Sequence, residues 1–575
     1  MRFRRFLRSL AAPVLAVAAL HAQTVVVTPS TSVLDAAGGT VTFTAAFSYD
    51  STPSVLGLNI VLPTGWSYVS GSDEPSFVKP ASGQQGALDW AYVTVPGTAP
   101  TFTFTATYPA STTTLQDFTV SSIGRSGTGA PPTTTVNPPL YIENASTLVT
   151  WNPNTTGDWG TAANWTPNLV PDNNSAEAYS VAMASGSANL TSSYAITNLQ
   201  FTGGTISGVN KSLTLHGLNS TWLAGTFEEL TTLIIERGAR LTASGSAPHV
   251  FNDTYINNKG DFTWTGPGDL TSAGGNIYNE IGATFTDASD NGTTATQLRL
   301  ESGYLPPTTA GAPADGFTLA AAAPSPNNGT FINLGTYQKT GLGETILTAN
   351  AVSNSGSFLV NAGQLTIDSV YLQNSGKLYV ASGATVRFNQ AGSPVSFAGG
   401  MITGGGTLQT ASEIFNQGTI SPGSPILGSL GIQGDLTLGA FSNLYIDIDG
   451  NVQGVSYDHL SVIGVAALTG NLTLNLLDHA RATLTALDTL TILSASSVTG
   501  NFALAVDTNG NPIPLTDGMR LNTLDNLASF RINYSSSAVT LTDFQLTVVP
   551  EPSTWALLIA GASALGVRAL RRRRA

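Results

Sequence analysis

The sequence contains no cysteine and few charged residues, and both shortages limit what the protein can be. Without cysteine, disulfide scaffolds, thiolate metal ligands and cysteine nucleophiles are excluded. Charged residues make up 10% of the 575 residues, against about 25% in an ordinary soluble protein. Long stretches are instead built from Thr, Ser, Asn, Gly, Val and Leu, which favour strands and turns over helices. The composition therefore predicts an all-β protein rather than a helical bundle or a doubly wound enzyme.

Basic residues are especially scarce in the body of the chain. Nine of the 22 Lys and Arg lie in residues 1–22 and 550–575, where Glu551 is the sole acidic residue among 35. The body between these ends therefore carries 34 acidic and 13 basic residues. Because such a body repels polyanions, we expect no nucleic-acid partner.

Residues 1–22 have the pattern of a secretory signal peptide. Four arginines precede an apolar run over residues 10–20, and Ala22 supplies the small residue that signal peptidase requires. The pattern predicts export, with a mature chain that begins near Gln23.

Residues 550–575 contain three elements in order. Pro550, Glu551 and Pro552 precede an apolar segment that starts at Trp555, and basic residues follow it: Arg568, Arg571, Arg572, Arg573 and Arg574. A helix over residues 555–570 is about 24 Å long, which is short against the ~30 Å hydrocarbon core of a bilayer. The tryptophan and the arginines suit its two interfaces, with the arginines in the cytoplasm. We therefore predict one C-terminal membrane helix, with the rest of the chain outside.

This tripartite end resembles the PEP-CTERM sorting signal of Gram-negative bacteria, in which a Pro-Glu-Pro motif precedes one membrane helix and a basic tail. The resemblance implies that an exosortase processes the chain at Pro550, Glu551 and Pro552. It also implies a transient membrane anchor, followed by a cell-surface or extracellular location. A plain tail anchor is the alternative.

The first part of the body alternates apolar and polar residues with a period of two. Over residues 24–126 such runs are separated by turn residues, which predicts an immunoglobulin-like β-sandwich. We expect Trp66 and Trp90 in its core, with sugar stacking as the alternative. Residues 127–147 are rich in Thr, Pro and Gly, which predicts a linker.

Residues 148–185 contain Trp151, Trp159 and Trp165 among turn residues. This segment resembles the tryptophan-rich stretch ahead of autotransporter-type β-strand repeats. A stacked solenoid needs its first coil covered, so we expect the three indoles to form a cap core. The alternative is an exposed carbohydrate-binding face.

An internal repeat follows the tryptophans. Asn-x-Gly recurs, and successive glycines such as Gly335, Gly356 and Gly376 stand 21 and 20 residues apart; its asparagines include Asn258, Asn333, Asn354, Asn374 and Asn416. A period near 20 with short strands predicts a right-handed parallel β-helix over residues 186–425. We expect glycine to supply positive φ at corners and asparagine to stack in ladders. Residues 426–549 form a further C-terminal β region that resembles the end of autotransporter passenger domains.

Candidate catalytic and metal-binding residues are few. The densest acidic stretch comprises residues that we expect to be solvated at turns of different coils: Asp253, Asp261, Asp269, Glu280, Asp287 and Asp290. Asp447, Asp449 and Asp458 have the spacing of a calcium loop, but Val452 replaces the expected glycine. Lys339-Thr-Gly341 and the Ser76 to Lys79 motif resemble penicillin-recognising motifs, yet they fall in different predicted domains. We therefore expect no catalytic residue, no metal site and no cofactor.

These patterns together predict an exported, non-enzymatic protein of the cell surface or extracellular matrix. The PEP-CTERM resemblance implies an adhesive or structural role in biofilm or exopolysaccharide, with extracellular polysaccharide as a partner. One alternative is a carbohydrate-active β-helix enzyme, a polysaccharide lyase or glycoside hydrolase, which needs two carboxylates in a groove. Another is a carbohydrate-binding surface module, which needs exposed coplanar tryptophans.

Overall fold

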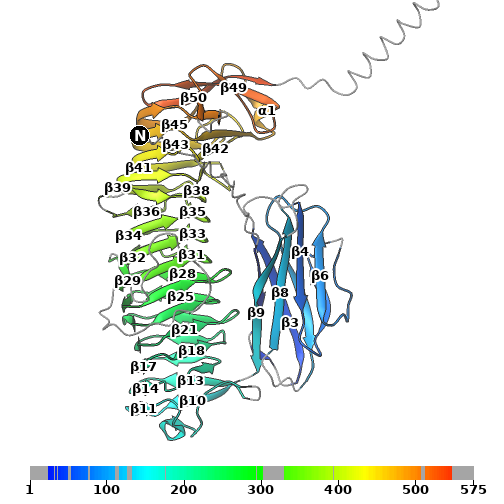
Figure 1. Cartoon of the computed structure of the whole chain (residues 1–575), viewed down its shortest axis with the longest axis vertical. Coiled ribbons are helices and arrows are strands. Elements are labelled where there is room, and N and C mark those ends of the chain that lie inside the picture. The colour runs from blue at the N-terminus through cyan, green and yellow to red at the C-terminus, as the bar shows by residue number, and fades with distance from the viewer. Residues whose placement is uncertain are drawn as a thin grey trace, which may run out of the picture. The chain divides into compact units, whose positions relative to one another are not determined.

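The computed structural model describes residues 24–546, except for residues 32, 35–36, 49–53, 76–77, 111–115, 126–132, 145, 175–176, 293, 302–328, 391, 393, 426 and 507–511. The predicted signal peptide and the predicted membrane helix therefore lie outside the described residues. The described part is all-β, with 50 strands, the helix α1 (Ala480–Thr483) and the 3₁₀ turn η1 (Ala162–Asn164). The chain divides into two compact units (Figure 1). The first extends to Ser146 and also includes Asn174–Glu177, and the second contains the rest.

The first unit contains two sheets around one hydrophobic core. One sheet has the order β1-β3-β7-β5 and the other β2-β9-β8-β4-β6. Their bounds are β1 (Thr24–Pro29), β2 (Val33–Leu34), β3 (Gly39–Ser48), β4 (Val55–Val61), β5 (Ser67–Ser72), β6 (Ala87–Tyr92), β7 (Thr101–Tyr108), β8 (Gln116–Arg125) and β9 (Thr133–Asn144). Alternate residues of facing strands, such as Phe43, Phe104 and Leu58, are buried between the sheets.

Trp66 and Trp90 lie in this core, as the period-two pattern predicts. Each buried indole N–H has a partner, because an unpaired polar group would be costly there. Trp66 Nε1 donates to Gln116 Oε1 at 2.8 Å, and Trp90 Nε1 donates to Glu74 Oε1 at 2.6 Å. Neither ring is available for sugar stacking.

Residues 127–147 differ from the predicted linker, because residues 133–144 form the strand β9. This strand pairs antiparallel with β8 and parallel with β2. Thr and Val favour an extended backbone, and a neighbouring strand edge offers hydrogen-bond partners that a linker composition does not reveal. Pro138 and Pro139 fall where the register with β8 shifts, a place where prolines without an N–H are tolerated.

The second unit is dominated by two long sheets whose strands pair in parallel from coil to coil (Figure 1). We call its described residues from 147 to 546 the parallel stack. The 17-stranded sheet contains β10 (Thr147–Trp151), β12 (Trp165–Thr166), β13 (Tyr179–Met183), β16 (Leu199–Phe201), β19 (Ser220–Trp222), β22 (Arg240–Ala243), β25 (Asp261–Gly266), β28 (Thr284–Ser289), β31 (Thr336–Lys339), β33 (Ser357–Val360), β35 (Lys377–Val380), β38 (Met401–Gly404), β40 (Thr419–Pro422), β42 (Asn443–Ile448), β44 (Asn471–Leu476), β46 (Ala503–Val506) and β47 (Pro512–Pro514).

The second sheet has 24 strands and runs along the same coils. Its strands are β11 (Thr156–Asp158), β14 (Ser187–Asn189), β15 (Tyr194–Ile196), β17 (Thr205–Ser207), β18 (Ser212–Leu215), β20 (Thr226–Glu228), β21 (Thr232–Ile235), β23 (His249–Asn252), β24 (Tyr255–Asn258), β26 (Leu270–Ala273), β27 (Asn276–Asn279), β29 (Thr296–Glu301), β30 (Thr330–Asn333), β32 (Glu344–Asn354), β34 (Gln364–Gln373), β36 (Thr385–Phe388), β37 (Val395–Phe397), β39 (Thr407–Asn416), β41 (Ser429–Leu438), β43 (His459–Leu468), β45 (Leu490–Gly500), β48 (Arg520–Asn522), β49 (Ala528–Tyr534) and β50 (Ala538–Leu546).

This arrangement is consistent with the parallel β-helix that the repeat predicts. Its parallel pairing begins earlier than residue 186, with β10 against β13, and continues past residue 425 to β43 against β45. Antiparallel pairs occur at both ends, in β10 with β12 at one end, and in β48 with β49 and β49 with β50 at the other. The spaced glycines stop near residue 418, but backbone pairing does not need them, so the stack extends further than the motif.

A buried ladder of amide side chains runs through the repeat coils. Asn258, Asn279, Asn333, Asn354 and Gln373 are fully buried, and each side-chain nitrogen donates to the side-chain oxygen of the next. The four distances are 2.7, 2.7, 2.9 and 3.1 Å. Each nitrogen also donates to a backbone carbonyl, as Asn333 does to Ser357 at 3.0 Å. The predicted ladder is confirmed, although Gln373 takes the place that the repeat assigns to the exposed Asn374.

The glycines of the repeat are required chiefly because successive corners approach closely. A Cβ at Gly356 would lie 2.1 Å from the carbonyl oxygen of Gly335, and one at Gly376 would lie 2.0 Å from that of Gly356. Gly376 also has a φ of +72°, whereas Gly335 and Gly356 have no positive φ. Glycine therefore supplies a positive φ at some corners, such as Gly363, Gly376 and Gly383. At Gly335 and Gly356 the close contact between backbones excludes a side chain on its own.

Aromatic rings stack in a second interior column. The rings of Phe262, Phe285, Tyr337 and Phe358 follow one another with centroids 4.8, 5.7 and 4.2 Å apart and interplanar angles of 22° to 27°. Equivalent residues of parallel strands face the same side of the sheet at the spacing between strands, so like side chains meet. The interior is thus built from columns that each coil extends.

We expect Asn333→Ala to lower the free energy of unfolding by about 3 kcal/mol, because it leaves the oxygen of Asn354 and the carbonyl of Ser357 without this donor. The midpoint of urea unfolding measures the loss. Asn361→Ala changes an exposed asparagine and serves as the control. Equal midpoints for the two variants would contradict a stabilising ladder.

Candidate functional site

The residues that the sequence assigns to sorting lie outside the described residues. These are the motif Pro550, Glu551 and Pro552, and the predicted helix flanks Trp555, Arg568, Arg571, Arg572, Arg573 and Arg574, whose roles stay predictions. The described chain ends at Leu546, the last residue of β50. The structure therefore describes the last strands of the body, which directly precede the sorting segment.

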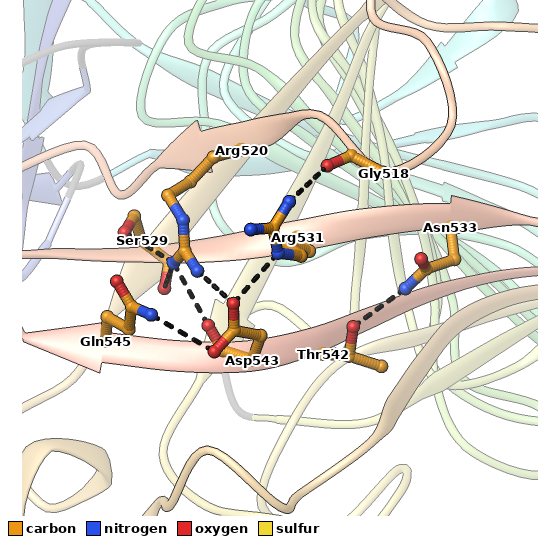
Figure 2. Close-up of polar contacts among 8 residues, drawn as sticks. All are labelled: Gly518, Arg520, Ser529, Arg531, Asn533, Thr542, Asp543 and Gln545. Atoms are coloured by element: carbon orange, nitrogen blue, oxygen red, sulfur yellow. Dashed lines mark hydrogen bonds and ion pairs between the residues drawn. The ribbon is translucent and has the colours of Figure 1, made fainter.

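Two arginines from neighbouring strands hold β50 through one carboxylate. Figure 2 shows Arg520 of β48 and Arg531 of β49 both directed at Asp543 of β50. Arg531 Nε lies 2.9 Å from Asp543 Oδ2, and the guanidinium of Arg520 pairs with the same oxygen. Gln545 Nε2 donates to the other carboxylate oxygen at 3.1 Å.

The same arginines also bind backbone carbonyls around Asp543. Arg520 Nη1 donates to the Asp543 carbonyl at 3.0 Å and to Ser529 Oγ at 3.0 Å, and Arg531 Nη1 donates to the Gly518 carbonyl at 2.9 Å (Figure 2). Asp543 has a φ of +51°, which few non-glycine residues adopt. The contacts hold this unusual backbone in place three residues before the described chain ends.

The hydrogen bond from Arg531, with the nearby charge of Arg520, keeps the pKa of Asp543 below its usual range. The carboxylate is therefore ionised at neutral pH, and both arginines retain their acceptor. Because these ion pairs are solvent-exposed, their net stabilisation is small, and their main effect is on geometry. We call Arg520, Arg531 and Asp543 the terminal clasp.

The sequence analysis did not single out the terminal clasp. Its members are separated by 11 and 12 residues, and isolated charges in a strand-rich segment are typical of any solvated face. The one available signal was that arginines are rare in the body of the chain, so that each of them was a candidate for a specific ion pair.

The three tryptophans of the predicted cap are buried. Trp151, Trp159 and Trp165 pack edge to face, with ring centroids 4.8 and 4.7 Å apart. Their indole nitrogens donate to the backbone carbonyls of Thr155, Pro171 and Trp159. The expected cap core is confirmed, and these rings do not form a sugar-binding face.

The acidic stretch does not converge on one site. Asp261 pairs with Arg240 at 3.2 Å on the surface, while Asp269 and Asp290 each accept a nearby backbone N–H, at 2.9 and 2.8 Å. Burial raises the pKa of Asp253, with the nearby Glu229 adding to the shift. Across residues 24–546, apart from the undescribed positions, no group of three His, Asp or Glu could hold a metal ion.

Asp287 differs from the expectation of a solvated turn residue, because it lies on β28 and is fully buried. Its carboxylate accepts the Ser289 hydroxyl at 2.6 Å and the Tyr337 hydroxyl at 2.9 Å. Lys339, its register partner on β31, is also fully buried and donates to Thr345 Oγ1 at 3.0 Å. Flanking Thr and Ser suggested a turn, but the interior of the coil accommodates hydroxyl groups as hydrogen-bond partners.

Burial lowers the pKa of Lys339, while the negative charges of Asp287, Asp290 and Glu344 raise it. Burial also raises the pKa of Tyr337 well above its usual range, with the charge of Asp287 adding to the shift. Lys339 begins the Lys-Thr-Gly sequence, and the Ser76 to Lys79 motif lies in the other unit. The lysine is thus engaged within the core of the stack.

The segment that has the spacing of a calcium loop is held by a buried carboxyl group. Asp458 is fully buried, and its two oxygens accept the backbone N–H groups of Gly428 and Asp447, both at 3.0 Å. The side chain of Asp447 instead accepts Asn475 Nδ2 at 2.6 Å. Both carboxylates are therefore engaged by protein donors rather than directed together at a common point.

Burial raises the pKa of Asp458 to about 7, against the opposing effect of its two backbone hydrogen bonds. In the unfolded chain an aspartate titrates near 4. Between these values the folded protein binds more protons than the unfolded chain, so stability falls as pH rises from about 4 to about 7.

We expect Asp458→Asn to remove this component of the pH dependence. Relative to the wild type, the variant should gain about 3 kcal/mol of unfolding free energy between pH 4.5 and pH 8, apart from a constant offset for its lost acceptor. Urea unfolding across this range measures the difference. Asp478→Asn, whose side chain is 97% exposed, is the control. Parallel curves for wild type and Asp458→Asn would contradict the assignment.

In the described part of the chain, helices are too short to cross a bilayer. The predicted membrane segment from Trp555 onward lies beyond it.

Comparison with known proteins adds one match. No curated protein matches the chain. Residues 548–574 match the PEP-CTERM protein-sorting motif, which begins two residues after the end of β50 and includes the Pro-Glu-Pro sequence and the arginines up to Arg574. The match indicates secretion with transient membrane anchoring and processing by an exosortase. The segment that leaves the terminal clasp therefore marks this chain as an exosortase-sorted extracellular protein.

Proposed function

We propose that the chain is a non-enzymatic structural or adhesive protein of the cell surface or extracellular matrix, released there by an exosortase. The observation that carries the proposal is the sorting motif at residues 548–574, directly after a body of stacked parallel coils. The exported body serves as a stable extracellular element, and the tail is used for delivery.

The proposed fold of the body follows from its register. We propose that the parallel stack is a right-handed parallel β-helix and that the first unit is an immunoglobulin-like sandwich. Supporting the first point, the amide ladder and the aromatic column recur once per coil. Supporting the second, two sheets of short strands enclose a shared core with buried tryptophans. Columns of this kind stabilise an extracellular protein that has no disulfides.

We also propose that the chain has no catalytic activity. The carboxylates that an acid-base mechanism would need are engaged in structural contacts: Asp287 with two hydroxyl groups, Asp458 with two backbone N–H groups and Asp261 with an arginine. A polysaccharide lyase or glycoside hydrolase needs such groups directed at a substrate. The proposal therefore disfavours the enzyme alternative.

We also propose that the chain contacts extracellular polysaccharide, and that tyrosine rings rather than tryptophan rings make this contact. Tyr255 and Tyr278 lie on adjacent coils of the 24-stranded sheet, with outward-facing, half-buried rings. The ring centroids lie 6.2 Å apart at an interplanar angle of 29°. Aromatic faces of this kind can cover apolar sugar surfaces. This observation favours contact with extracellular polysaccharide over the alternative of tryptophan-mediated binding.

We expect Glu551→Ala to leave membrane insertion intact and to block release. Two prolines around one glutamate restrict the backbone to an extended shape that an enzyme can read, while the apolar segment alone is enough for anchoring. Intact-mass analysis of the extracellular and membrane fractions measures the outcome. Wild-type protein should lose its C-terminal segment, whereas Glu551→Ala should remain full-length in the membrane.

Glu228→Ala, which changes an exposed glutamate of the body, is the matched control and should be released like the wild type. Extracellular wild-type protein that still ends in Arg574-Ala575 would contradict processing. Normal release of Glu551→Ala would contradict the role of the motif.

A further inference from the structure

The sorting segment leaves the body beside a particular turn. Leu546, the last residue of β50, is the register partner of Ala528, the first residue of β49. Residues 523–527 form the turn directly before Ala528, and Thr523 N donates to the Ala528 carbonyl at 2.9 Å. The chain that carries the sorting motif therefore starts next to this turn.

Two further loops adjoin the turn through polar contacts. Arg481 of α1 pairs with Asp525 in the turn, and Leu524 N donates to the Leu474 carbonyl at 2.8 Å. The loop after α1 is joined in turn to residues 449–456, because Asn451 Nδ2 donates to Asp488 Oδ1 at 2.9 Å. These contacts link the turn before β49, the loop after α1 and residues 449–456 to one another.

Large apolar side chains project from these loops into solvent. We call them the exit surface: Val452, Val455, Leu487, Leu524 and Leu546. Leu487 is 94% exposed, Val455 70% and Leu524 61%. The side-chain contacts that join the loops are made by polar residues and not by these aliphatic groups. Clustered exposed aliphatic residues with a polar border are typical of a protein interaction site.

The short connection between β50 and the sorting motif indicates which protein contacts the exit surface. Four residue steps separate Leu546 from Pro550, so the motif lies at most about 14 Å from the end of β50. A folded domain of only ~100 residues already has a radius of gyration near 13 Å. An enzyme that grips Pro550 to Pro552 must therefore touch the surface from which the chain emerges.

We propose that the exit surface is a docking site for the exosortase that reads the motif, in addition to the motif itself. This inference rests on the proposed function. Carboxylates of Asp478, Asp488 and Asp525 border the aliphatic groups, and Arg481 is the cation among them. The complementary face of the enzyme is therefore apolar with basic residues around it. The same carboxylates disfavour an anionic lipid surface as the occupant.

The test is the rate of tail release for the full-length chain in cells that contain the exosortase. We expect the double variant Leu487→Ser/Leu524→Ser to be released about fivefold or more slowly, because exposed anchor residues at an interface carry much of the binding energy. Val209→Ser changes a 60% exposed aliphatic residue between β17 and β18, at the other end of the stack, and should be released at the wild-type rate. Unchanged urea midpoints would show that all variants are folded.

Glu551→Ala separates this inference from the proposed function. If Glu551→Ala is retained in the membrane while the double leucine variant is released at the wild-type rate, the motif acts alone and the docking site is wrong. If Glu551→Ala is released, the proposed function itself fails.

Lengthening the connection gives an independent test. Twelve Gly and Ser residues inserted after Leu546 should slow release and reduce the effect of the leucine substitutions, because the effective concentration of the exit surface at the enzyme falls. Faster release would mean that the body obstructs the enzyme, which overturns the proposal. Released wild-type protein that dimerises or binds anionic vesicles, when the double variant does neither, would assign the surface to a second copy or to lipid and would also overturn it.

Discussion

Backbone hydrogen bonding between successive parallel coils is the interaction on which the rest of this structure depends. Because each strand pairs in register with its equivalent in the next coil, every interior side chain meets the side chain at the same position one repeat later. A buried asparagine can then pair its amide with the amide at the same position of the next coil, as Asn279 does with Asn333. The same closeness excludes a Cβ where the corners at Gly335 and Gly356 meet.

This constraint also explains the distribution of polar groups that could otherwise be taken for an active site. A coil interior of this kind accepts buried polar groups when they find hydrogen-bond partners there. Asp287 is partnered by Ser289 of its own strand and by Tyr337 of the next coil. The stack ends in antiparallel strands, and the terminal clasp fixes the last of them. The sorting motif lies in a short segment after β50, and the coils before it form the body of the extracellular protein.

The sequence predicted the features that depend on local periodicity. The buried tryptophans of the cap, the parallel strands and the amide ladder all follow from residue types at fixed spacing. The sequence failed where a partner far away in the chain decides the outcome. The strand β9 forms because β8 offers an edge to pair with. Asp287 can be buried because Tyr337, 50 residues later in the chain, donates a hydrogen bond to it. The terminal clasp was missed for the same reason, since Asp543 meets Arg520 only after two strand reversals. The sorting residues stay sequence predictions, supported by the family match.

The register of the parallel stack can be tested directly because the chain contains no cysteine. Thr263 on β25 and Thr286 on β28 are register partners with outward-facing side chains, so their Cα atoms lie within the range that a disulfide spans. Under mild oxidation, Thr263→Cys/Thr286→Cys should form an intramolecular disulfide, seen as a linked peptide by mass spectrometry. Thr263→Cys/Thr284→Cys, displaced by two residues on the same face, should remain reduced. Equal linkage of both pairs, or linkage of the displaced pair alone, would contradict the parallel, in-register stack.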